Sequence, residues 1–254
     1  RMKSFNATLA ACILLGIGAM CLNTAGNVLG PNVLFEGENP ARASNFLNVF
    51  FAVGLLIVPM LASLLLKKIS YENALSILAV IGLVPVIVAL VSAYPPAGQP
   101  ITIGAAVSLV KSPAVLVAAF ALFSYIALEA SLTNWVVPYG KEVIKEVEPE
   151  RDPDAIDASA QRMMSLFAIG MILGRLLAWV FGKHITDYGG YVIAAMGVIA
   201  AVVIIIMMVN KSAAAAWILV LLIGLAFAPC FPTIVGVTFA KFDPNVHGSV
   251  FGII

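Results

Sequence analysis

Two amides and a hydroxyl lie within five positions of one strongly apolar stretch of this sequence. The segment CLNTAGN carries Asn23, Thr24 and Asn27. A carboxamide left without a hydrogen-bond partner in hydrocarbon costs several kcal/mol, so these residues need a role. Amides both donate and accept hydrogen bonds, which suits them to the hydroxyl groups of a polar solute. Asn23 and Asn27 are therefore candidate substrate-binding residues.

A second pair of amides, Asn45 and Asn48, follows at i and i+3 on the next apolar stretch. It stands about as far from the intervening polar loop as Asn23 and Asn27 do, so the four amides are predicted to lie at similar depth and to form one polar wall. The alternative is that they hydrogen-bond neighbouring helices together, at about 0.6 kcal/mol per bond. The sequence leaves both interpretations open.

Glu129 and Arg175 are the two charged residues that fall well inside the predicted membrane spans. Each costs roughly 2.5 to 3.5 kcal/mol at a helix centre, so each is expected to face a bundle interior or water. Glu129 shares a helical stripe with Tyr125 and Thr133, which predicts a polar face lining a cavity. The alternative is a protonated acid bonded to a neighbouring helix. The predicted spans set Glu129 and Arg175 about 12 Å apart in depth, which argues against an ion pair.

Asn134 and Trp135 complete the candidate substrate-binding set, because they lie close to the stripe of Glu129. An amide at position 134 adds a further donor and acceptor. Trp135 is either an anchor at the membrane interface or a platform on which a ligand stacks.

No signature of an enzyme or a metal site occurs in the sequence: HExxH, GxSxG, a CxxC pair and a phosphate-binding Gly-Lys-Ser/Thr loop are all absent. His184 and His247 are predicted to be solvated loop residues, and Cys12, Cys21 and Cys230 to pack inside the spans. The net charge of +1 and the lack of a basic run give no reason to invoke nucleic acid. We therefore expect a protein that is not an enzyme, without a cofactor or metal.

The elements that must position these residues are membrane-spanning helices. The chain of 254 residues is 62% hydrophobic and 11% charged, which is typical of an integral membrane protein. About 20 apolar residues cross a hydrocarbon core of about 30 Å. This ruler predicts an all-α, polytopic membrane protein with seven spans, near residues 5–30, 42–66, 72–93, 113–138, 160–182, 190–209 and 214–240.

The connections predict two groups of helices. Residues 95–112, rich in proline, read as a linker between a first bundle at 1–94 and a second at 113–254. The acidic stretch 141–161 is predicted to be a solvated loop. Pro229 and Pro232 predict a kinked helix, because they free the carbonyl oxygens of the residues four positions earlier unless another donor binds them.

Several stretches resemble the major facilitator superfamily and, within it, the fucose permease branch of sugar:proton symporters. They include GIGAMCLNTAGNVLG, FSYIALEASLTNWVVPY, IGMILGRLLAW and GLAFAPCFPTIVG. The resemblance implies twelve helices in two six-helix bundles that open a central site alternately to either side of a plasma (inner) membrane. It places this chain at helices 4 to 10 and the start of 11, with a cytoplasmic linker, so that the missing helices of the same protein would be partners of the bundle.

One position departs from that branch. Asn23 stands where the fucose permease carries a functional glutamate, and an amide cannot take up a proton. Glu129, or a carboxylate on the missing helices, would have to carry any coupled proton. The resemblance also gives gating or structural roles to Arg175 and Asp187. Pro229 and Pro232 are further candidates for such a role.

The expected sidedness conflicts with the charge distribution. The family topology places Arg42, Lys111, Lys183 and Lys241 on the cytoplasmic face, whereas more Lys and Arg lie on the opposite face. The positive-inside rule would therefore give the chain the opposite orientation. We follow the family topology, because the first helices usually dominate orientation.

The sequence thus favours a secondary transporter that moves a small polar solute, such as a sugar, by alternating access, with proton coupling open. One rival is a carrier of the same fold that exports drugs or lipophilic compounds, which predicts aromatic and aliphatic cavity walls. The other is a non-transporting seven-helix receptor or sensor.

Overall fold

The computed structural model of the chain describes residues 4–94 and 102–254, which are helical almost throughout. Seven helical segments in these residues are long and apolar enough to cross a membrane, which confirms the predicted fold class. The α-helices are α1 (Phe5–Val33), α2 (Pro40–Leu66), α3 (Tyr71–Ile81), α4 (Val84–Val91), α5 (Ile103–Ser108), α6 (Pro113–Val147), α7 (Pro153–Val180), α8 (Gly182–Val209), α9 (Ala213–Phe227), α10 (Cys230–Phe239) and α11 (His247–Ile253). Short 3-10 turns are η1 (Leu34–Gly37), η2 (Leu109–Lys111) and η3 (Pro244–Val246).

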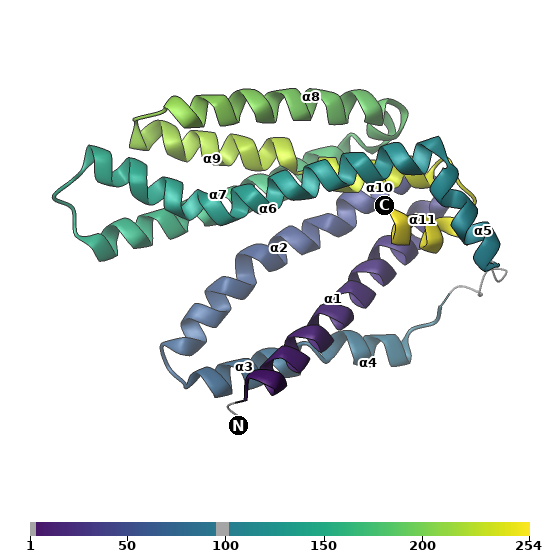
Figure 1. Ribbon diagram of the computed structural model, residues 1–254, viewed down its shortest axis with the longest axis horizontal. Coiled ribbons are helices and arrows are strands. Elements are labelled where there is room, and N and C mark those ends of the chain that lie inside the picture. The colour runs from purple at the N-terminus through teal and green to yellow at the C-terminus, as the bar shows by residue number, and fades with distance from the viewer. Residues whose placement is uncertain (1–3, 95–101) are drawn as a thin grey trace.

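Helices α6 to α9 run alongside one another, while α1 to α4 lie to one side of them (Figure 1). The two groups meet near the start of α2, which packs on α7 and α10 and then diverges from them (Figure 1). The buried residues of α2 all lie between Pro40 and Ala52, so its second half has no helix covering it within the described residues. The helices therefore form a V whose closed end holds the first half of α2.

Glycines make the close contacts of the bundle possible. A Cβ on Gly170 of α7 would lie 2.6 Å from the carbonyl oxygen of Leu221, and one on Gly224 of α9 would lie 2.5 Å from that of Phe167. At the closed end, a Cβ on Gly236 of α10 would collide with the backbone of Ala41 in α2. Backbones can approach this closely only where side chains are absent, as is common between membrane helices.

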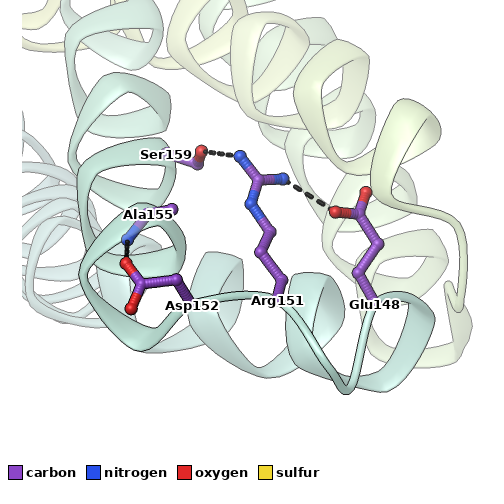
Figure 2. A network of polar contacts seen from close by, with 5 residues as sticks. All are labelled: Glu148, Arg151, Asp152, Ala155 and Ser159. Carbon is purple, nitrogen blue, oxygen red and sulfur yellow. Dashed lines mark hydrogen bonds and ion pairs between the residues drawn. The ribbon is translucent and has the colours of Figure 1, made fainter.

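The prediction of a long solvated loop at 141–161 was wrong. Helix α6 continues to Val147 and α7 begins at Pro153, so only residues 148–152 connect them. Figure 2 shows the contacts of this turn: Arg151 donates to Glu148 Oε2 at 3.0 Å and to Ser159 Oγ at 2.9 Å, while Asp152 Oδ2 accepts from the N–H of Ala155 at 3.0 Å. Charged residues extend both helices beyond their apolar spans, and a count of apolar residues does not detect such extensions.

Two further predictions about loops were wrong. His184 was expected to lie in a loop between the spans 160–182 and 190–209, but α8 begins at Gly182 and includes it, with non-helical torsion angles at Tyr188. His247 was expected to be solvated, but its side chain is 3% exposed. Its Nε2 lies 3.0 Å from the carbonyl oxygen of Phe239 and its ring stacks on that phenylalanine, so backbone acceptors hold it inside.

The helix is interrupted where Pro229 and Pro232 were predicted to kink it. Helix α9 ends at Phe227 and α10 begins at Cys230, so one membrane-length segment is divided in two. Within the predicted linker at 95–112, residues 95–101 lie outside the described residues, and the remainder contains α5 and η2.

Candidate functional site

A polar cavity of about 220 Å³ lies where α1, α2, α6, α7 and α10 converge. Four of its seven lining side chains are polar or charged, which is unusual for a region enclosed by such apolar helices. The lining residues are Asn23, Asn48, Phe51, Ile126, Glu129, Arg175 and Phe231.

An amide network connects three of the predicted site residues along one side of this cavity. Asn27 Nδ2 donates to Asn23 Oδ1 at 2.9 Å and to the Asn23 carbonyl oxygen at 3.0 Å. Asn48 Nδ2 donates to Asn27 Oδ1 at 3.4 Å and to the carbonyl oxygen of Ser44 at 2.9 Å. Asn27 is buried and orients the other two, which line the cavity. Among the described residues, the amide nitrogen of Asn23 has no hydrogen-bond partner, so it remains able to donate to a ligand.

Asn45 lies apart from this network. It is fully buried, and its Nδ2 donates to Thr233 Oγ1 on α10 at 3.1 Å and to the carbonyl oxygen of Ala41 at 2.9 Å. Helix α2 packs between α1 and α10, so Asn48 faces α1 while Asn45 faces α10. The four amides therefore do not share one wall, and Asn45 contacts a neighbouring helix instead.

Arg175 is buried, with 1% of its surface exposed, and its guanidinium joins three elements. Its Nε donates to the carbonyl oxygen of Ala228 at 3.1 Å, and its Nη1 donates to the carbonyl oxygen of Asn48 at 2.7 Å. The guanidinium carbon also lies 5.4 Å from the ring centroid of Phe51. Arg175 thus connects α7 to α2 and to the break between α9 and α10.

Glu129 and Arg175 line the same cavity, although the sequence set them at different depths. They make no ion pair among the described residues. The hydroxyl of Tyr125 lies near both of them and is buried. The cavity therefore carries one carboxyl group and one guanidinium that remain apart.

Asn134 and Trp135 lie outside the cavity. Asn134 is exposed and its Nδ2 donates to the carbonyl oxygen of Ala130 in its own helix, at 2.8 Å. Trp135 is 68% exposed and borders a separate apolar groove of about 170 Å³ between α6 and α8, with Ile204 and Met207. Five and six residues beyond Glu129, both positions have rotated away from its helical face.

The remaining predicted residues lie at the closed end of the V. Asp187 is an exposed residue of α8, and Pro229 and Pro232 are buried at the break between α9 and α10. The cavity residues that sequence reasoning missed are Phe51, Ile126 and Phe231. Ordinary apolar residues in apolar helices carry no signal of their own, and only helical spacing from Asn48 and Glu129 points to Phe51 and Ile126.

Two larger hollows lie away from these residues. One of about 640 Å³ borders the α6–α7 turn, where Lys141 Nζ lies 2.8 Å from Asp157 Oδ1. Another of about 520 Å³ lies between the diverging parts of α2 and α7, lined by Pro59 and Ser63 on one side and Gln161 on the other. The second hollow marks the open end of the V.

A bundle of seven membrane-length helices within the described residues defines a multi-pass membrane protein. The sequence matches the family model of the Major Facilitator Superfamily over residues 2–254, so the chain belongs to this superfamily of membrane transporters. No curated protein and no solved structure matched the chain. Family membership gives the class of activity, transport of a small molecule across a lipid bilayer.

Proposed function

We propose that the protein moves a small hydroxylated solute of the sugar class across the membrane by alternating access, through the cavity of Asn23, Asn48 and Glu129. The observation that carries this proposal is the chemistry of the wall: the amides of Asn23 and Asn48 and the guanidinium of Arg175 line one cavity with the carboxyl group of Glu129. A sugar presents both donors and acceptors to such a wall. Phe51 and Phe231 add aromatic surface suited to the C–H face of a sugar ring. The resemblance to the fucose permease branch supports the same solute class.

The rival carrier of lipophilic compounds fits this wall less well. It predicts an aromatic and aliphatic cavity, whereas Asn23, Glu129 and Arg175 stand beside the apolar residues of this wall. An apolar solute would leave the amides and charges of this wall buried without hydrogen-bond partners, which costs free energy. A hydroxylated solute would form hydrogen bonds with them and offset that cost.

Glu129 is the proposed proton carrier. Among the described residues it is the one carboxylate in the cavity wall, since Asn23 occupies the position at which the resembled branch has a glutamate. We further propose that the closed end of the V, which holds Arg42 and Lys183, faces the cytoplasm of a plasma (inner) membrane.

Uptake into proteoliposomes tests this function. The full-length protein is reconstituted and supplied with a panel of radiolabelled sugars and a lipophilic dye, with and without a pH gradient. Saturable uptake of at least one sugar, accelerated by an inward proton gradient, is expected. In Glu129→Gln the gradient loses its effect, whereas Glu142→Gln, an exposed residue further along α6, retains it. Saturable flux of the dye alone would refute the sugar assignment, and a gradient effect that persists in Glu129→Gln would refute the role of Glu129.

A further inference from the structure

The carbonyl oxygen of Ala228 is the starting point for an inference about Arg175. In a continuous helix this oxygen would accept from the N–H four residues later, but that residue is Pro232, which has no N–H. Arg175 Nε supplies the missing donor at 3.1 Å. Gly174 permits this approach, because a Cβ at that position would lie 2.5 Å from Ala228 Cβ.

The guanidinium of Arg175 also hydrogen-bonds to α2, which belongs to the group α1 to α4. Its Nη1 donates to the carbonyl oxygen of Asn48 at 2.7 Å, in the part of α2 that packs at the closed end. Asn48 and Arg175 also line the cavity. One side chain therefore connects the cavity wall, α2 and the break between α9 and α10.

Arg175 makes no direct ion pair. No carboxylate lies within ion-pair distance of it among the described residues, and it contacts backbone carbonyls and the ring of Phe51. A buried charge without a directly paired acid is expensive, so a negative group in the cavity competes strongly for it. Glu129 lines the same cavity and is such a group.

We propose that Arg175 is a positioning residue that clamps α2 to the α9–α10 break, and that the clamp is released when the guanidinium turns from the two carbonyls toward Glu129 or a bound solute. Release leaves the carbonyl of Ala228 without a donor and frees α2 to move away from α10. The proposal rests on the proposed function in one respect, that this cavity is the solute site. It also explains the role of Pro232, because this proline leaves the carbonyl oxygen of Ala228 available to the side chain of Arg175.

Alkylation of a native thiol tests the clamp without any solute. Cys230 is the first residue of α10 and is 6% exposed, so its reaction with N-ethylmaleimide reports opening of the break. The full-length protein is used with Cys12→Ser and Cys21→Ser, which remove the two exposed cysteines. Arg175→Gln is expected to raise the alkylation rate of Cys230 at least tenfold, a change of about 1.4 kcal/mol in the opening equilibrium. Arg175→Lys, which keeps the charge but not the forked donor, is expected to give a smaller increase.

Pro232→Ala makes the test specific. It restores an N–H at position 232 that donates to the carbonyl of Ala228, so Arg175→Gln in this background is expected to raise the rate less than threefold. Pro59→Ala, which removes the proline inside α2, is the matched control and is expected to leave the tenfold increase intact. An unchanged rate in both Arg175 variants, or equal increases in the two proline backgrounds, would overturn the clamp. Because no transport is measured, failure of the sugar assignment would leave this result standing.

Discussion

His247 and Asn32 lie 215 positions apart in the sequence, and the Nδ1 of the imidazole is 3.0 Å from the Oδ1 of the amide. The contact joins the end of α1 to the start of α11. On its other side the imidazole faces two carbonyl oxygens, of Phe239 at 3.0 Å and Phe242 at 3.1 Å. His247 therefore fixes the turn after α10 against the first helix of the chain.

We expect His247→Ala to destabilise the protein by about 2 kcal/mol, because it removes the imidazole from the carbonyl oxygens of Phe239 and Phe242, of which only that of Phe239 keeps a backbone donor, and removes the stacking on Phe239. His184→Ala is the control, since His184 is exposed on α8, and it should change stability by less than about 0.5 kcal/mol. Thermal unfolding in detergent measures both. Equal effects of the two substitutions would mean that His247 does not hold this turn.

Gly170 and Gly224 should be intolerant of any side chain. We expect Gly170→Ala and Gly224→Ala each to cost more than about 2 kcal/mol, because the new methyl group meets a backbone carbonyl that cannot move without shifting a helix. Gly197→Ala on α8 is the matched control. It places a methyl group in open space and should stabilise the helix, by up to about 1 kcal/mol. Folded yield and unfolding temperature would show the opposite signs.

Asn45 should act through stability rather than transport. We expect a double-mutant cycle of Asn45→Ala and Thr233→Val to give a coupling energy of about 0.6 kcal/mol, as measured for other hydrogen bonds between membrane helices. Asn23→Ala should instead lower uptake of the solute by more than its loss of one hydrogen bond to Asn27 lowers stability, because its amide also lines the cavity. Loss of uptake without loss of stability in Asn45→Ala would return Asn45 to the binding site.

Phe51 and Trp135 distinguish the cavity from the groove. We expect Phe51→Ala to raise the KM for the transported sugar about fivefold, equivalent to roughly 1 kcal/mol of aromatic contact. Trp135→Ala should leave this KM unchanged, because Trp135 borders the groove between α6 and α8. Initial uptake rates across a range of solute concentrations measure both values. The reverse result would place the site in the groove.

The sequence was sufficient for the number of spans, because apolar length is a property of each segment by itself. It also predicted the break at Pro229, since a missing N–H acts locally. Partners across space were beyond it. Asn45 and Asn48 look equivalent at i and i+3, and only the packing of α2 between α1 and α10 gives one a contact with Thr233 and the other a place in the cavity. The burial of His247 likewise depends on Asn32, far away in the chain.

Helix α6 has 35 residues and is about 52 Å long, whereas the hydrocarbon core is about 30 Å thick, so about 20 Å of it extends beyond the hydrocarbon core. Helix α7 accompanies this projection, and the pair is braced by Lys141 with Asp157 and by Arg151 with Ser159. This braced helical pair offers a rigid epitope. An antibody fragment bound to it would add the rigid feature outside the membrane that particle alignment in electron cryomicroscopy needs.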